Sequence, residues 1–143
     1  MTPATYEDVN LILKLYDMRR EEQMRIARTW FSGNFKPKTM AEYDRLCPRS
    51  SGMNAHARQV ITYWDMVASF ICSGVLNQEL FFQSGRELLF VWIRLEPIVQ
   101  EWRALYKDPD FLKNLETVGT AFAEYLRKRG AEAYENFVAR VRG

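Results

Sequence analysis

Cys72 and Glu79, a thiol and a carboxylate, lie in the apolar run "DMVASFICSGVLNQELFF" at residues 65–82 and raise the question of an active site. A nucleophilic cysteine needs a neighbouring base. The only histidine of the chain, His56, precedes Cys72 by sixteen residues, which is about 24 Å along a continuous helix. We therefore predict that Cys72 is a buried, unreactive core residue. The run is expected to form a corner between two helices, with Gly74 in the left-handed conformation.

The scarcity of histidine also argues against a metal centre. A di-iron helical bundle takes Glu-x-x-His from two helices, whereas the residue three before His56 is Met53. Cys47 and Cys72 form no CxxC pair of the kind that structural zinc sites use. We interpret Cys47 as a helix-end cysteine and His56 as a surface residue across the same loop. The sequence predicts no metal, no cofactor and no catalytic centre, and so a protein that is not an enzyme.

Charge and hydropathy exclude further classes of function. The 20 basic and 18 acidic residues are interleaved along the chain, whereas a nucleic-acid partner requires segregated basic charge. No phosphate-binding glycine motif is present. The most apolar run, "MVASFICSGVL", is far short of the ~20 residues of a membrane span, and the first residues carry no secretory signal. We expect a soluble cytoplasmic protein with free thiols and with neither nucleic acid nor membrane as partner.

Four charged residues on or near the central helices could line a pocket for a small ligand or a substrate. They are Asp65, Glu79, Arg86 and Arg94. Perturbed charges mark functional sites, but structural ion pairs are the commoner role of such residues. The pocket is therefore the alternative hypothesis, and a buried cluster of these four side chains would support it.

The four tryptophans invite a comparison with aromatic ligand cages. Trp64, Trp92 and Trp102 fall on the apolar stripes of expected helices, which favours core packing over a cage. Trp30 precedes a loop and is expected to be partly exposed.

Helical periodicity runs through nearly the whole chain, and strand-like alternation is absent. The pattern predicts an all-α fold, an irregular bundle of five long and two short helices in a single domain over residues 1–143. The expected helices span residues 6–32, 40–47, 54–73, 78–83, 85–107, 109–129 and 131–141. Capping boxes are expected at Thr5–Asp8, Thr39–Glu42 and Ser84–Glu87, side-chain caps at Asn54, Asn77 and Asp108, and helix ends at Gly33, Gly74 and Gly130. Pro97 lies inside a predicted helix and should kink it.

Three segments give the chain a family resemblance: "RREEQMRIARTWF", "ARQVITYWDMVASFICSGVLNQELFF" and the tryptophan-bearing helix that follows. These patterns resemble a bacterial, all-helical family known as domain of unknown function 4760, from about Asp8 to Tyr106. The resemblance implies a helical fold and a bacterial, cytoplasmic protein. It implies no activity and no functional residues.

The first expected helix, from Tyr6 to Ser32, would be about 40 Å long. Its polar middle, "DMRREEQ", interrupts the apolar stripe, so that its two ends can pack against different partners. We therefore predict a non-catalytic domain that acts through protein–protein contacts, either with another protein or as a homodimer. The expected interaction surface comprises Arg19, Arg20, Gln23 and Trp30.

Overall fold

The computed structural model describes residues 2–143 of the chain. These residues form nine α-helices, joined by turns and loops, and no strand. The predicted all-α fold is confirmed. The helices are α1 (Tyr6–Arg19), α2 (Glu22–Asn34), α3 (Met40–Leu46), α4 (Gly52–Cys72), α5 (Gln78–Phe82), α6 (Arg86–Leu95), α7 (Val99–Tyr106), α8 (Lys113–Arg129) and α9 (Ala133–Arg142). The two additional helices arise because two of the predicted helices are each divided in two.

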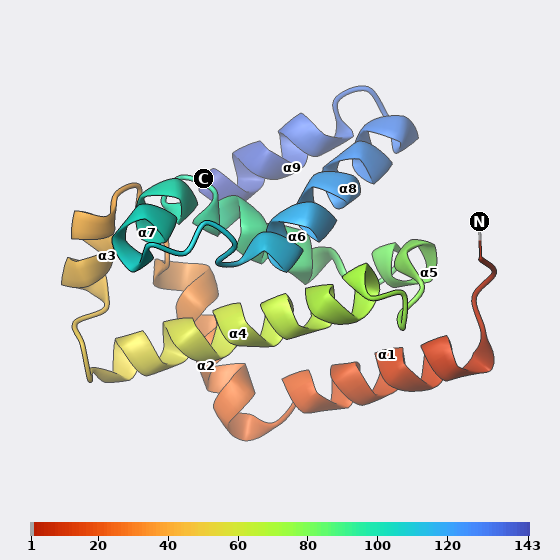
Figure 1. Cartoon of the computed structure of the whole chain (residues 1–143), viewed down its shortest axis with the longest axis horizontal. Helices are drawn as coiled ribbons and strands as arrows, with labels where there is room; N and C mark the ends of the chain where they lie inside the picture. The colour runs from red at the N-terminus through yellow and green to blue at the C-terminus, as the bar shows by residue number, and fades with distance from the viewer. Residues whose placement is uncertain (1) are drawn as a thin grey trace.

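The first division separates α1 from α2 and corrects the prediction of one helix from Tyr6 to Ser32. Arg20 still has helical backbone angles, but Glu21 is extended and its carboxylate accepts hydrogen bonds from the N–H groups of Gln23 and Met24, at 3.0 and 3.2 Å. Glu21 therefore caps a new helix. Figure 1 shows α1 along one edge of the molecule and α2 turning away from it to cross α4.

The second division falls at Pro97, where a kink was predicted. Proline lacks the N–H that the Ile93 carbonyl would accept within a helix. The chain turns through residues 96–98, and α7 starts at Val99. The prediction that Asp108 caps a helix beginning at Pro109 is wrong, because α8 starts only at Lys113, after Leu112 in a left-handed conformation.

Several predicted helix ends are confirmed. Thr5 and Asp8 form a complete capping box at α1, and the Asn77 side chain accepts the N–H of Leu80 at the start of α5. Gly74 follows α4 with φ +81°, the left-handed conformation that its lack of a Cβ allows.

Other predicted helix ends need correction. Ser51, and not Asn54, caps α4, while the carboxamide oxygen of Asn54 accepts the Tyr43 hydroxyl. Thr39 caps α3, but Glu42 returns its carboxylate to the N–H of Lys38, so the box is incomplete. Gly33 lies inside α2 and does not end it. The Ser84–Glu87 box is absent, since the first turn of α6 has no side-chain cap.

The core surrounds α4, which packs against α2, α6 and α8. Trp64, Trp92 and Trp102 are buried, as predicted, and Trp30 is half-buried. Helices α6 and α8 approach closely because Gly119 leaves room for the Trp92 indole, which would lie 2.5 Å from a Cβ at that position. The tryptophans therefore help to fix the spacing of the central helices.

Candidate functional site

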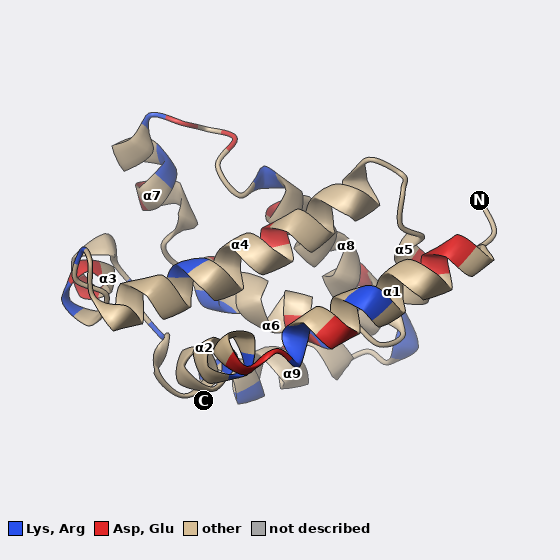
Figure 2. Ribbon diagram, turned by 90° about the horizontal axis from the view of Figure 1, so that it is seen from below, with Lys and Arg blue, Asp and Glu red and all other residues tan. Residues whose placement is uncertain are grey.

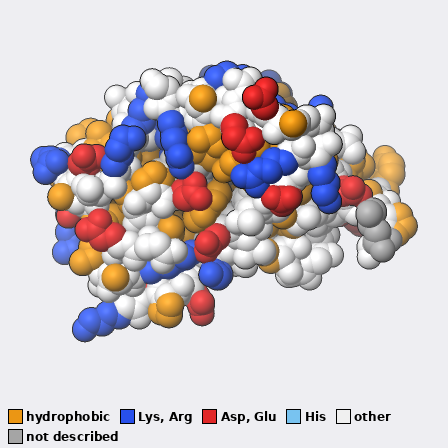
Figure 3. All heavy atoms as spheres, turned by 90° about the horizontal axis from the view of Figure 1, so that it is seen from above, with side chains coloured by type: hydrophobic (Ala, Val, Ile, Leu, Met, Phe, Trp, Pro, Cys, Tyr) orange, Lys and Arg blue, Asp and Glu red, His pale blue; other side chains and the backbone are white. Residues whose placement is uncertain are grey.

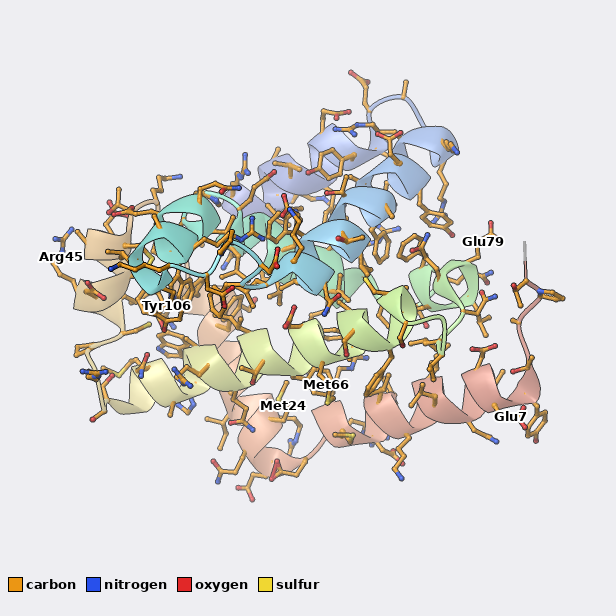
Figure 4. The ribbon with its side chains drawn as sticks, viewed as in Figure 1. Glu7, Met24, Arg45, Met66, Glu79 and Tyr106 are labelled. Atoms are coloured by element: carbon orange, nitrogen blue, oxygen red, sulfur yellow. The ribbon has the colours of Figure 1, made fainter. Side chains whose placement is uncertain are left out.

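The four residues of the predicted pocket lie in separate environments. Asp65, half-buried on α4, accepts the N–H of Leu115 in the first turn of α8, at 3.2 Å. Burial raises the pKa of the Asp65 carboxyl, and the hydrogen bond from Leu115 opposes this shift. Glu79 is exposed on α5, at the end of the molecule opposite Arg45 (Figure 4). Within residues 2–143 no ion pair or hydrogen bond joins any two of the four.

Arg94 has a structural role. Its guanidinium is buried and donates hydrogen bonds to four carbonyl oxygens, those of Phe31, Ser32, Phe35 and Val141. These carbonyls stand at the C-terminal ends of α2 and α9, where backbone acceptors carry partial negative charge. The Phe31 carbonyl also accepts the N–H of Phe35, at 2.9 Å. Burial lowers the pKa of Arg94. Its positive charge therefore joins two helix ends without a carboxylate.

Arg86, the fourth member of the predicted set, borders a wide groove. This groove has a volume of about 800 Å³ and lies between α2, α6 and α9; we call it the α2–α6–α9 groove. Its apolar lining is Phe31, Val60, Phe90, Val91 and Phe137. Its charged lining is Arg25, Arg28, Arg86 and Glu87. The groove has the size of a small-molecule site, and Phe90 is the one apolar lining residue that is not buried.

Glu87 is the most heavily used carboxylate near this groove, and sequence reasoning missed its role. Arg28 donates two hydrogen bonds to it, at 2.8 and 2.6 Å, and the Trp64 indole N–H donates a third at 3.2 Å. The hydrogen bond to Glu87 raises the pKa of Arg28. Arg19 completes the cluster at 3.6 Å. Glu87 thereby connects α1, α2 and α4 to α6. No local sequence pattern indicates this role, because its partner Arg28 lies 59 residues away in the sequence.

The predicted interaction surface is only partly available to a partner. Arg19 is engaged by Glu87 and stacks on Tyr16 and Trp64, with its guanidinium 5.1 and 5.5 Å from the ring centres. Trp30 is half-buried and packs against His56 and Phe35. Arg20 and Gln23 are exposed beside the turn between α1 and α2.

An exposed apolar stripe on α1 is the more conspicuous surface feature. Tyr6, Val9, Leu13 and Tyr16 are 78%, 41%, 59% and 48% exposed and follow one another at spacings of three, four and three residues. The stripe therefore runs along one side of the helix. Leu15, on another side of α1, is buried against the fold. Leu13 and Tyr16 also border a second groove of about 290 Å³, together with Trp64 and Phe81.

Cys47 stands at the end of α3, as predicted, whereas Cys72 differs from its prediction. Cys47 is buried, with 3% of its surface exposed, and burial raises the pKa of its thiol to about 11. Cys72 is exposed, because it is the last residue of α4 and its side chain lies beside the carbonyl of Asn114 at the edge of the core. The prediction of a buried Cys72 is wrong. Partial burial, followed by the charge of Asp65, still raises the pKa of Cys72.

Charged side chains of both signs are mixed over the surface, with hydrophobic side chains visible between them in the face shown in Figure 3. Among residues 2–143, no group of three or more His, Cys, Asp and Glu side chains is placed to hold a metal ion. Across the same residues, no helix combines the length and the apolar character needed to cross a bilayer.

These features define a helical domain with an exposed apolar helix and a basic-rimmed groove. Residues 4–142 match the model of the family described as "Domain of unknown function (DUF4760)", and the chain belongs to that family. The resemblance predicted from the sequence is confirmed, over a longer range than the quoted segments covered. Neither the curated proteins nor the solved structures include a significant match.

Proposed function

We propose that this domain acts through protein–protein contacts and that it self-associates through α1. The exposed apolar stripe of α1 carries the proposal. Tyr6, Val9, Leu13 and Tyr16 occupy the a and d positions of two successive heptads, which is the pattern of a helix that packs along a second helix. Exposed apolar side chains gathered in a row are typical of an interaction surface, whereas single ones are not.

The charges of α1 favour an antiparallel pair. Glu7 is exposed in the first turn, and the exposed Arg20 follows the last residue of the helix. Figure 2 marks acidic residues at the N-terminal end of α1 and both basic and acidic residues further along it. An antiparallel arrangement brings Glu7 of one chain towards Arg20 of the partner subunit and also opposes the two helix dipoles. A parallel pair would place like charges together.

Such a pair has two-fold symmetry with Leu13 near the axis, so that Val9 meets Tyr16 of the partner subunit. Tyr6 and Tyr16 have surfaces of about 200 Å² each and are 78% and 48% exposed. Together with Val9 and Leu13 they give the stripe an exposed area of roughly 400 Å² per chain. This is below the ~800 Å² per partner of a standard stable interface. The proposal therefore specifies a reversible dimer whose population depends on concentration.

A non-catalytic role is part of the proposal. Both thiols have pKa values raised by burial, which reduces the thiolate available for nucleophilic attack. His56 packs against Trp30, with 5.9 Å between the ring centres. The most heavily bonded carboxylate, Glu87, joins four helices together and so has a structural use.

Sedimentation velocity over a range of protein concentrations tests this function. The parent chain should shift from monomer towards dimer as concentration rises, and Leu13→Glu should remain monomeric because it places a carboxylate at the two-fold axis. Met18→Glu is the matched control. Met18 is also an exposed apolar residue of α1, 44% exposed, but it lies about 160° around the helix from the stripe. A parent chain that is monomeric throughout, or a Met18→Glu chain that dissociates as readily as Leu13→Glu, would refute the proposal.

A further inference from the structure

We infer that the α2–α6–α9 groove is a binding site for an amphiphile with a carboxylate head and a single apolar chain. This inference does not depend on α1 or on self-association. It rests on two independent properties of the groove: an apolar lining, and arginine side chains around it that have no carboxylate partner.

The lining can accept an apolar chain. Phe31 and Val60 come from α2 and α4, Phe90 and Val91 from α6, and Phe137 from α9, so the apolar surface is assembled from four helices. A volume of about 800 Å³ falls within the ~300–1,000 Å³ of sites for small molecules. Phe31, Val60 and Val91 are at most 1% exposed and Phe137 is 9% exposed, so the half-buried Phe90 presents most of the apolar surface that a chain can reach. Covering Phe90 and the edge of Phe137 would remove that area from water at about 25 cal/mol per Å².

Three guanidinium groups beside this lining have no acidic partner. Arg86 and Arg140 both lie with their charge 5.6 Å from the centre of the Phe137 ring. Arg25 donates its Nε hydrogen to the Arg20 carbonyl. Within residues 2–143 no carboxylate lies within 4 Å of any of the three, whereas Arg28 is paired with Glu87.

Arginines without ion-pair partners are common on protein surfaces, where they are solvated. The combination with an apolar groove is what indicates a ligand. A guanidinium binds a carboxylate with two parallel hydrogen bonds and so fixes its orientation. A carboxylate at Arg86 and Arg140 would neutralise charge next to Phe137, at one border of the apolar lining, and leave its chain to follow that lining.

A small amphiphile fits this groove better than a peptide does. The groove is bounded by helices, so it offers no sheet edge to which an extended peptide could add its backbone hydrogen bonds. A helix of about 10 Å diameter fills 800 Å³ with roughly two turns. Two turns are too few for a helix that is stable by itself.

Isothermal titration with dodecanoate, below its micelle concentration, tests the site, with dodecanol as the uncharged probe. Dodecanoate should bind the parent chain, and dodecanol should bind at least tenfold more weakly because it lacks the guanidinium contacts. The double variant Arg86→Gln with Arg140→Gln should weaken dodecanoate binding by a similar factor. Arg45→Gln with Arg49→Gln, which removes two exposed arginines at and just after α3, is the control of equal charge and should bind as the parent does.

Gly33 allows the apolar part of the site to be tested without unfolding the protein. It borders the groove and lies within α2, and a Cβ built there meets no atom within 4 Å. Gly33→Leu should therefore fill part of the groove and abolish dodecanoate binding without lowering the melting temperature. Gly52→Leu is the matched control, because Gly52 also has open space but lies outside the groove.

Any one of the following results would overturn the inference. They are the absence of dodecanoate binding to the parent chain, equally tight binding of dodecanol, and undiminished binding by a folded Gly33→Leu chain. Binding of an acidic amphipathic peptide without binding of dodecanoate would also refute it, in favour of a protein partner. Leu13→Glu should bind dodecanoate as the parent does, which separates a failure of this site from a failure of dimerisation.

Discussion

Replacing Arg94 by Met should destabilise the protein by about 3–5 kcal/mol, because it leaves carbonyls at two helix ends without a donor. The guanidinium is 6% exposed and reaches the Phe35 and Val141 carbonyls at 2.9 Å, and two further carbonyls of α2 at 3.2 and 3.3 Å. Each hydrogen bond to a charged group contributes about 1.5–3 kcal/mol. Removing the charge also removes its desolvation cost, which offsets part of that sum.

The expected loss is a large share of the total free energy of unfolding. Domains of this size are held together by about 5–15 kcal/mol, so Arg94→Met can approach complete unfolding. Arg94→Lys should be intermediate, since one ammonium cannot reach both the α2 and α9 ends in the way a planar guanidinium does. Urea denaturation followed by circular dichroism gives the free energy of unfolding of each chain. Hydrogen exchange should show the largest loss of protection in α9, which Arg94 holds through Val141.

Arg86→Met is the matched control. Arg86 lies on the same helix, has no ion pair or hydrogen bond within residues 2–143, and should change stability by no more than about 0.5 kcal/mol. An Arg94→Met chain that unfolds within about 1 kcal/mol of the parent would refute the reasoning. It would mean that the desolvation free energy of the buried guanidinium is as large as the stabilisation from its four hydrogen bonds.

Three further predictions follow from the described contacts. A thiol reagent should label Cys72 in the native protein and Cys47 only after unfolding, as mass spectrometry of the labelled peptides would show. Gly119→Ala should lower the free energy of unfolding by about 1–3 kcal/mol, because its Cβ would lie 2.5 Å from the Trp92 indole; an unchanged melting temperature would contradict this. Hydrogen bonds from two backbone N–H groups hold the pKa of Asp8 below its usual 3.8, so its contribution to stability is present above that value and is lost as pH falls through the lower, folded-state pKa. Acid titration of Asp8→Asn should accordingly show a smaller loss of stability below pH 4 than the parent shows.

The helical fold and several of the helix ends could be predicted because their signals are local. The Thr5–Asp8 box, the Asn77 cap and the Gly74 turn each depend on residues within a few positions of one another. Pro97 interrupts a helix wherever it lies in the interior of one. The division before α2 escaped prediction because Glu21 is not among the preferred capping residues, although its carboxylate accepts two backbone N–H groups here.

The misassigned residues depend on contacts that are distant in the sequence. Glu87 stands where a capping residue is expected, but Arg28, 59 positions earlier, recruits its carboxylate into an ion pair. Cys72 lies on the apolar side of α4, yet α4 ends there and the core does not extend beyond it. In each case the hydrophobic periodicity predicted a helix at this place, but it could not predict which distant residues pack against that helix.

The arginines show why the candidate site also had to await the structure. Arg94, Arg28 and Arg103 are all satisfied inside the fold, by helix-end carbonyls, by Glu87, and by the Phe111 carbonyl with Glu116, respectively. Within residues 2–143, Arg86 and Arg140 have no such partner, and both lie beside Phe137 at the border of the α2–α6–α9 groove. In the sequence all five are arginines on amphipathic helices, and Arg86 and Arg94 even belong to the same helix. Hydrogen-bond acceptors from distant segments decide which of these arginines stabilise the fold and which remain available to a ligand. Binding should therefore be tested at the α2–α6–α9 groove and not at the predicted four-residue pocket.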